Sequence, residues 1–321
     1  MKISLVLATY NGEKYLKKQL DSIINQTTKI DEIIIVDDCS IDETVNIVTK
    51  YIRNNNLMDW KFVVNDENLG YRKNFRKAIS MATGDIIFLC DQDDIWSKYK
   101  VEKMIDVLKD KRVYSLASSF YFIDKNGKKF KIKKKVNKSN NNLLEQRINK
   151  KLTKIGLNIL LKNNFSQGCT MAFNKLLRDE YLRYSEGKLP HDWEINLLAS
   201  IHNGCYYMDE ELIGYRIHEE NTIGLDSITN NSIVEKKSKR ISDRVKLTVC
   251  EKEVVEFVLQ LDMLDIDKRI FCERYRSYLN KRIEIFHSKS IKSSLSFFLS
   301  GGYKEFGHFK TVVGDIIAVI L

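Results

Sequence analysis

An apolar run that ends in crowded carboxylates restricts the fold of this chain more than any other feature. Residues 86–89 are all apolar and follow a Thr-Gly-Asp triplet, a pattern typical of a buried strand. Asp91, Asp93 and Asp94 come directly afterwards, and no group nearby in the sequence neutralises them. Such carboxylates are tolerated where water solvates them or where they share a cation. Mg²⁺ prefers carboxylate oxygens and also takes oxygens from a substrate phosphate. A solvated acidic turn is the alternative, but the preceding buried strand favours a metal–phosphate site.

The first hundred residues alternate between predicted strands and predicted helices. The strands cover residues 3–8, 32–36, 61–64 and 86–89, and the helices cover residues 13–25, 42–54 and 72–81. This order predicts an α/β fold with a doubly wound, mostly parallel sheet flanked by helices. Ligands of such sheets bind at the carboxyl ends of the strands. The polar or glycine-containing segments at those ends are Thr9-Tyr10-Asn11-Gly12, Asp37-Asp38, Asn68-Leu69-Gly70 and Asp91 to Asp94.

The pattern changes after these strands. We expect residues 164–174 to form a loop that enters a strand, residues 195–201 to be helical, and residues 205–215 to form a short strand pair. From about residue 226 the chain is charged, with apolar residues at helical spacing. The sequence therefore predicts an α/β domain over residues 1–225 and a helical, partly amphipathic region over residues 226–321.

The charge balance is basic, because 53 Lys and Arg residues exceed 43 Asp and Glu residues by 10. A lysine run over residues 128–138 contributes to this excess, and we expect it to be a solvated loop; contact with acidic lipid or an anionic acceptor is the alternative. The six cysteines show no C-x-x-C spacing, which indicates reduced, buried thiols in a cytosolic protein. The apolar run over residues 3–8 is too short for a signal segment and leads straight into a motif, and we expect no apolar run long enough to span a bilayer.

Four blocks in order resemble the nucleotide-binding blocks of family 2 glycosyltransferases, which have a GT-A fold. The blocks are Thr9-Tyr10-Asn11, residues 36–44 around Asp37-Asp38, Asn68-Leu69-Gly70, and Asp91-Gln92-Asp93-Asp94 with Trp96. The last block is similar to that of the bacterial rhamnosyltransferase-like branch. Cys39 and Glu43 stand where the family usually has glycine, which removes some conformational freedom from that loop.

The resemblance implies roles for individual residues. Asp192 matches the catalytic base, and Gly168 lies where the family brings backbone near the sugar; we also expect Trp193 to face the acceptor. A divalent cation, Mg²⁺ or Mn²⁺, would be held by Asp93, Asp91 and His218. The implied nucleotide-binding residues are Thr9, Tyr10, Asn11, Asp38, Asn68, Gly70, Asp91 and Arg72. The alternatives are a helix N-cap for Asp192 and a structural role for His218.

The expected reaction moves a sugar from a nucleotide diphosphate donor, dTDP-rhamnose or a UDP-hexose, to a saccharide acceptor. A carboxylate accepts the proton of the acceptor hydroxyl, and one direct displacement inverts the anomeric carbon. The resemblance implies a lipid-linked acceptor, often polyprenyl-linked, in bacterial surface polysaccharide synthesis. We therefore expect a cytoplasmic protein that is peripheral on the cytoplasmic face of the membrane.

The C-terminal segment supplies a possible membrane contact. Phe309, Val312, Val313, Ile316, Ile317 and Ile320 can form one apolar stripe on a helix, with Lys304 and Lys310 nearby. Such a helix binds a membrane interface, and its basic charge favours anionic lipid. Docking on the protein's own core or on a second subunit is the alternative, so an oligomer stays possible.

Two other classes of function compete with a glycosyltransferase. A nucleotidyltransferase that makes a nucleotide sugar usually has a glycine-rich loop with a basic residue after the first strand, and residues 9–14 do not supply one. A module that binds nucleic acid or an acidic polymer would interleave aromatic residues with its basic patch, but residues 128–138 contain only Phe130. We therefore expect no nucleic-acid partner.

Overall fold

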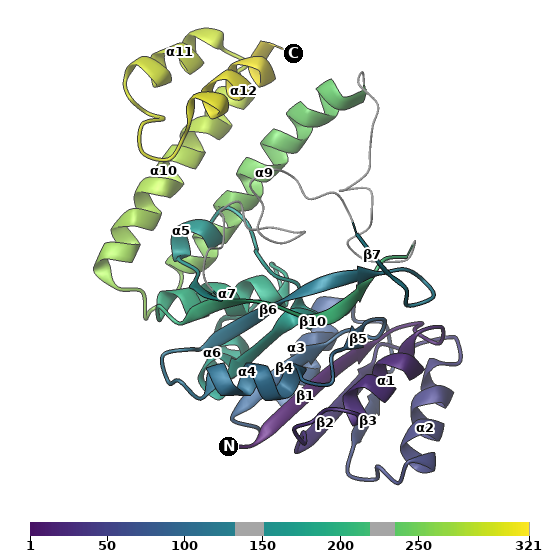
Figure 1. Cartoon of the computed structure of the whole chain (residues 1–321). Helices are drawn as coiled ribbons and strands as arrows, with labels where there is room; N and C mark the ends of the chain where they lie inside the picture. The colour runs from purple at the N-terminus through teal and green to yellow at the C-terminus, as the bar shows by residue number, and fades with distance from the viewer. Residues whose placement is uncertain (132–150, 219–234, 321) are drawn as a thin grey trace. The chain divides into compact units, whose positions relative to one another are not determined.

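The computed structural model describes residues 1–131, 151–218 and 235–320, and the chain forms two compact units, residues 1–225 and 226–321 (Figure 1). Lys133, Lys134, Lys135 and Lys138 of the lysine run lie outside the described residues.

The first unit is built on one large mixed sheet in the order β3-β2-β1-β4-β9-β6-β10-β5. Strands β3, β2, β1 and β4 pair in parallel, whereas β9 is antiparallel to both of its neighbours, so β6 and β10 run in the same direction as β1. The strands are β1 (Ile3–Thr9), β2 (Glu32–Asp37), β3 (Lys61–Val64), β4 (Ile86–Cys90), β5 (Ile95–Trp96), β6 (Ser115–Ile123), β7 (Lys129–Phe130), β8 (Leu152–Lys154), β9 (Met171–Asn174) and β10 (Cys205–Arg216). The α/β class and the mostly parallel central sheet agree with the prediction.

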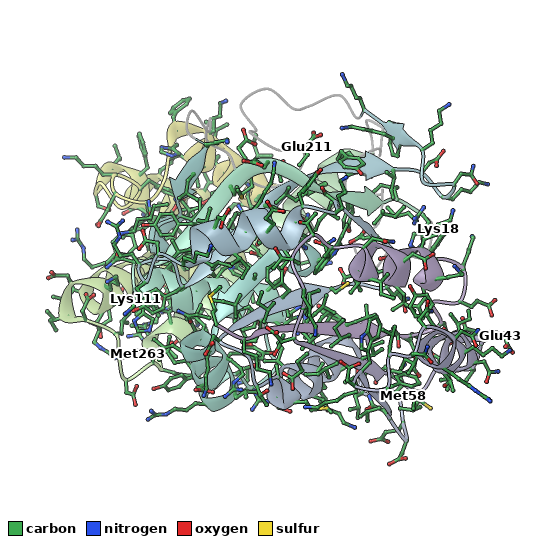
Figure 2. The ribbon with its side chains drawn as sticks, turned by 60° about the horizontal axis from the view of Figure 1, so that its bottom comes forward. Lys18, Glu43, Met58, Lys111, Glu211 and Met263 are labelled. Carbon is green, nitrogen blue, oxygen red and sulfur yellow. The ribbon has the colours of Figure 1, made fainter. Side chains whose placement is uncertain are left out.

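Helices cover both faces of this sheet, which explains why β1, β2 and β4 are apolar along almost their whole length. Side chains of α1, α2 and α4 share one core with Leu5, Leu7 and Phe88. Helices α3, α6 and α7 contact one another and pack on β1, β2, β4, β6, β9 and β10. The helices of this unit are α1 (Leu16–Ile24), α2 (Thr44–Asn54), α3 (Tyr71–Met81), α4 (Lys100–Leu108), α5 (Leu157–Leu160), the 3₁₀ turn η1 (Gly168–Thr170), α6 (Lys175–Tyr184) and α7 (His191–Ile201). Charged side chains such as Lys18, Glu43, Lys111 and Glu211 extend from its surface (Figure 2).

Three details of the first unit correct the sequence-based expectations. The predicted strand pair over residues 205–215 is a single strand, β10, whose pairing with β6 shifts register on either side of Glu211. Lys129 and Phe130, expected in a solvated loop, form β7 against β6, and Lys129 pairs with Glu211. All six cysteines are described and no disulfide joins them; Cys90, Cys169, Cys205 and Cys272 are buried, but Cys39 and Cys250 are partly exposed.

The second unit is helical, with α9 (Glu235–Leu259), α10 (Ile266–Ser288), α11 (Ile291–Leu299) and α12 (Phe309–Ile320). Asp315 of α12 is fully buried and accepts hydrogen bonds from Arg282, Arg244 and Tyr303. These contacts fix which face of α12 points inward. Among the described residues, no helix combines the length and the apolar character needed to cross a bilayer.

The single apolar stripe predicted for residues 309–320 is therefore wrong in part. Val312 and Val319 lie on the buried side with Asp315, whereas Phe309, Val313 and Ile317 are exposed on the other side. The two sets are both at helical spacing, so the sequence pattern alone does not separate them.

Candidate active site

Loops at the carboxyl ends of the parallel strands are joined by hydrogen bonds. The amide of Gln92 pairs with the backbone of Tyr10 in both directions, at 2.8 and 2.9 Å. Gly12 permits this approach, because a Cβ there would lie 2.2 Å from the Gln92 side chain. The Asn11 backbone N–H donates to the Ser40 hydroxyl, and the Asn11 side-chain oxygen accepts from the backbone of Ile41. The blocks after β1, β2 and β4 thus form one continuous rim.

The paired aspartates after β2 organise this rim. Asp37 is fully buried and accepts hydrogen bonds from the hydroxyls of Thr9 and Ser40. Asp38 accepts the backbone N–H groups of Leu69 and Gly70, each at 2.8 Å. Two of the predicted nucleotide contacts, Thr9 and Asp38, therefore also hold the loops together, whereas Tyr10, Asn11 and Asn68 are exposed.

Cys39 lies in this loop with a positive φ of 64°. An L-residue other than glycine is strained in that region of backbone conformation. The cysteine thus stands where glycine would be favoured, as its comparison with the family motif implies, and the loop keeps the glycine-like conformation.

The acidic block after β4 brings Asp93 against His218. The Asp93 carboxylate lies 2.7 Å from His218 Nε2, although 125 residues separate them in the sequence. Burial, together with the negative charges of Asp93 and Asp192, raises the pKa of Asp91 to about 7. Burial also raises the pKa of Asp94, whose carboxylate accepts the backbone N–H of Arg216. Of the three predicted cation ligands, Asp93 and His218 are thus in direct contact, and Asp91 is linked to Asp93 by the effect of its charge.

Two buried cations accompany this cluster, and sequence reasoning missed both. Lys100 is fully buried, lies 3.5 Å over the Trp96 ring and donates to the Cys169 carbonyl at 2.6 Å. Arg216 is also fully buried, and its side chain donates to the Asp93 carbonyl. Burial lowers the pKa of Lys100 to about 8. The only sequence signals were that Lys100 comes shortly after the acidic block and that Arg216 lies two residues before His218.

Asp192 lies in the first turn of α7, and burial raises its pKa to about 6. Pro190 is the N-cap residue, so the alternative of Asp192 as an N-cap is wrong. The Asp192 carboxylate accepts from Asn164 and from the backbone of Trp193. The charge of Asp192 contributes to the raised pKa of Asp91, so the two carboxylates interact electrostatically. A buried carboxylate with a raised pKa is suited to act as a general base.

Two other predicted residues make structural contacts. Arg72 donates to the carbonyls of Gly187 and Lys188, in the loop that precedes α7. The indole N–H of Trp193 donates to the carbonyl of Leu160, at the end of α5. Both side chains hold the segments around Asp192 in place.

The residues of the acidic block fit a hard divalent cation. Carboxylate oxygens suit both Mg²⁺ and Mn²⁺, and an imidazole nitrogen suits transition metals. Donor atoms of Asp91, Asp94 and Cys169 also lie within 4.8 Å of one another. Burial, and after it the neighbouring carboxylates, raise the pKa of Asp91 and of Asp94, and a bound cation would favour their ionised forms.

Comparisons with known proteins agree with this arrangement. Residues 4–180 match the sequence model of the family described as glycosyl transferase family 2, which is more than half of the 321 residues. The chain therefore belongs to the family 2 glycosyltransferases.

Several curated relatives are similar to the chain over part of its length. It is 26% identical to the dTDP-rhamnosyl transferase RfbG of Shigella flexneri, over 68% of this chain and 73% of that protein. It is 37% identical to the uncharacterized glycosyltransferase MJ1057 of Methanocaldococcus jannaschii, over 41% of this chain and 47% of the relative. The match to the uncharacterized glycosyltransferase alr2836 of Nostoc covers 39% of that protein, so the chain spans less than half the length of these last two relatives.

Solved structures show the same fold. TarS 1–349 of Staphylococcus aureus in complex with UDP superposes with a TM-score of 0.57 at 18% identity, over 100% of this chain and 81% of that one. The mannosyltransferase PcManGT of Pyrobaculum calidifontis, in complex with GDP-Man and Mn²⁺, has a TM-score of 0.55 at 14% identity, over 99% and 86%. These likenesses establish the GT-A fold of the chain.

Proposed function

We propose that this chain is an inverting, cation-dependent glycosyltransferase of bacterial surface polysaccharide synthesis. Its donor is dTDP-rhamnose or a UDP-hexose, and its acceptor is a lipid-linked saccharide. The similarity to RfbG supports the dTDP-rhamnose donor, and the UDP complex of TarS supports a UDP donor. Family membership favours sugar transfer over the two alternatives, nucleotidyl transfer and the binding of an anionic polymer.

One observation carries the proposal: the buried Asp192 carboxylate is electrostatically coupled to the acidic block that ends β4. Deprotonation of an acceptor hydroxyl requires a base with a pKa near the working pH. Release of a nucleotide diphosphate requires positive charge at the neighbouring position. Asp192 would meet the first requirement, and a cation held by the acidic block would meet the second.

Each side chain then has a defined part in the displacement. Asp192 accepts the proton of the acceptor hydroxyl while Asn164 and the Trp193 backbone fix the direction of its carboxylate. The exposed side chains of Tyr10, Asn11 and Asn68, in the loops after β1 and β3, bind the nucleotide. Because Asp192 acts directly on the acceptor, a single displacement occurs and the anomeric configuration inverts.

Asp93, Asp91 and His218 are the residues that would hold the divalent cation. When bound, such a cation supplies Lewis-acid stabilisation of the diphosphate leaving group. The Mn²⁺ in the PcManGT complex supports a divalent cation as the cofactor.

The test is a transfer assay with dTDP-rhamnose, UDP-glucose or UDP-GlcNAc as donor and Mg²⁺ or Mn²⁺ as cation. Activity should disappear with EDTA and return when the cation is added back. Asp93→Asn should lose activity, while Asp110→Asn, which alters an exposed carboxylate paired with Arg112, should retain it. Full activity of Asp93→Asn in EDTA would refute the assignment of the cation site.

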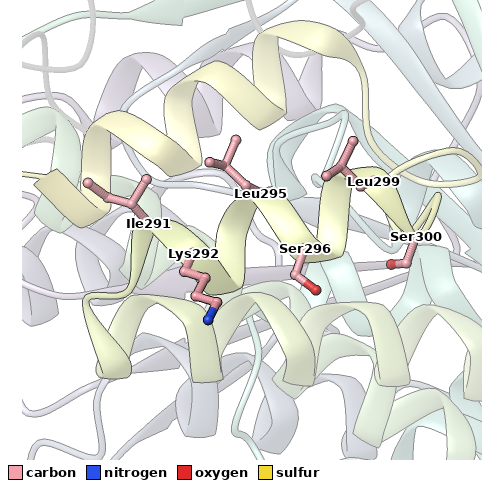
Figure 3. Close-up of a pocket in the computed structure, with 6 residues that line it drawn as sticks. All are labelled: Ile291, Lys292, Leu295, Ser296, Leu299 and Ser300. Carbon is pink, nitrogen blue, oxygen red and sulfur yellow. The ribbon is translucent and has the colours of Figure 1, made fainter.

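We also propose that the second unit binds the membrane surface through α11 and α12. Ile291, Leu295 and Leu299 follow one another along one side of α11, next to Lys292, Ser296 and Ser300 (Figure 3). On α12, the exposed Phe309, Val313 and Ile317 have the same spacing of four residues. The two helices contact each other, and Leu299 and Phe309 are 81% and 75% exposed. This apolar face, with the exposed Lys292, Lys304 and Lys310, has the chemistry of an interfacial helix pair on anionic lipid.

A further inference from the structure

His191 is a buried imidazole whose polar atoms have no role in the fold. It is the first residue of α7, directly before Asp192, and only 5% of its surface is exposed. Neither ring nitrogen has a hydrogen-bond partner among the described residues. A buried polar group without a partner destabilises the folded protein, so a histidine that keeps two such atoms requires an explanation.

Neighbouring rings fix the position of this imidazole. It stacks on Phe75, with ring centres 4.0 Å apart and planes 22° apart, and it meets the edge of Tyr71 at 6.3 Å. Burial and the positive charge of Arg72 lower its pKa to about 3. The ring is therefore neutral at working pH, with one nitrogen that donates and one that accepts.

The imidazole lies between the two segments expected to surround the donor. Tyr71 and Phe75 belong to the start of α3, which follows the rim residues Asn68 and Gly70. On its other side, Nε2 approaches Gly168 so closely that a Cβ there would lie 2.8 Å from it. Glycine at position 168 thus leaves room for the ring, and the proposed base is the next residue along the chain.

We propose that His191 hydrogen-bonds a hydroxyl group of the sugar that is transferred. A hydroxyl group both donates and accepts, so it can pair with whichever ring nitrogen faces it, in either tautomer. A diphosphate oxygen only accepts, so it can pair only with the nitrogen that carries the proton. The assignment rests on the proposed glycosyltransferase function, and it makes His191 a determinant of sugar selectivity beside the base.

The test separates binding of the sugar from binding of the nucleotide. Dissociation constants are measured for dTDP against dTDP-rhamnose and for UDP against UDP-glucose, and each ratio isolates the contribution of the sugar. His191→Phe keeps the stacked ring but removes both nitrogens. It should reduce the ratio about three- to tenfold, the value of one hydrogen bond, and leave the affinity for the nucleotide unchanged.

His202→Phe is the matched control. His202, directly after α7, also stacks on an aromatic ring, that of Tyr114, with ring centres 5.0 Å apart. Its Nε2, however, is paired with Glu180 of α6. This control should leave the ratio unchanged. His191→Gln, which restores a donor and an acceptor, should recover part of the lost selectivity, and the acid limb of the pH profile should stay in place because His191 is neutral.

Measurements on the unaltered protein keep the proposal testable even if a variant fails to fold. At least one monodeoxy analogue of the accepted donor sugar should bind about three- to tenfold more weakly. If no analogue binds more weakly, or if His191→Phe leaves the ratio unchanged while transfer persists, only this inference is overturned. If the unaltered protein binds neither nucleotide sugar, the proposed function fails and this inference fails with it.

Discussion

The two units treat their buried acids in opposite ways. In the second unit, Asp315 is fully buried and directly paired with Arg282 and Arg244, at 2.7 and 3.0 Å. In the first unit, Asp94 is just as deeply buried, yet its carboxylate accepts a backbone N–H from Arg216, and the nearby Lys100 donates to a carbonyl instead. The pKa of Asp94 is accordingly raised by burial and by two neighbouring carboxylates.

The two units also differ in the kind of side chain that each exposes on its surface. The second unit satisfies its internal charge but exposes apolar side chains along α11 and α12. The first unit buries its apolar residues between helices and sheet but concentrates negative charge at one rim. The difference matches the two proposals, a cation with a diphosphate at the first unit and an anionic membrane surface at the second.

The comparison is tested most severely by removing the base from the first unit. Asp192→Asn should reduce kcat about 10²- to 10⁴-fold, because the amide cannot accept the acceptor proton, while donor affinity changes little. The measurement is steady-state kinetics together with calorimetric donor binding.

Glu194→Gln is the control for this variant, since Glu194 is a buried carboxylate on the same helix that accepts from the Ser185 hydroxyl. It should keep most of the activity. Normal turnover by Asp192→Asn would show that another group is the base.

In the second unit, removal of the Arg282 guanidinium should lower the stability of the fold and leave catalysis unchanged. Arg282→Met leaves Asp315 buried with fewer partners and should lower the free energy of unfolding of this unit by about 3 kcal/mol. Urea denaturation, with hydrogen exchange over residues 266–320, measures the loss.

Arg274→Met alters an exposed pair with Glu305 and should cost less than about 1 kcal/mol. Equal losses for both variants would mean that the Asp315 cluster adds nothing beyond an ordinary surface pair.

The pH dependence of activity should follow Asp192. Its pKa is raised to about 6 by burial, and the carboxylate must be unprotonated to act as the base. Activity is therefore complete above that pH, and kcat/KM should fall about tenfold for each unit below it. An acid limb near pH 4 would indicate that the carboxylate is solvated in the working enzyme.

The smallest expected effect concerns the apolar face of the second unit. Replacing Leu299 and Phe309 together with serine should weaken binding to phosphatidylglycerol-containing vesicles about fivefold, because each side chain loses part of its buried apolar area. Flotation with vesicles of increasing anionic content measures the change.

Ile266→Ser with Ile270→Ser is the control, since both residues are exposed and apolar but lie on α10. If the two double variants bind equally well, α11 and α12 do not form the membrane contact.

Some parts of the fold were predictable because their signals are local. Strands β1, β2 and β4 are short apolar runs that end in polar residues. A continuous apolar run is the pattern expected of a strand buried on both faces, so these strands could be predicted from the sequence. In β10 the sequence predicted a strand pair, but the acidic residues Asp209, Glu210 and Glu211 lie within one continuous strand. Its pairing with β6 shifts register on either side of Glu211.

The site divides in the same way. The acidic block of Asp91 and Asp93 was singled out by its place after an apolar run, whereas Asp192 and His218 were singled out by their resemblance to positions of the family. The sequence could not show that Arg72 and Trp193 hold backbone carbonyls, nor that Lys100 and Arg216 lie beneath the acidic block.

Residue types and their order were thus enough for the class of fold and for the acidic block at the end of a strand, because these depend on local hydrophobic pattern and on side-chain chemistry. The interaction partners of individual side chains could not be predicted from the local pattern. The pairing of Asp315, the inward side of α12 and the unsatisfied imidazole of His191 depend on contacts between residues far apart in the chain. Such contacts exist only after packing has removed water from both partners, and no local pattern records which pairs will meet.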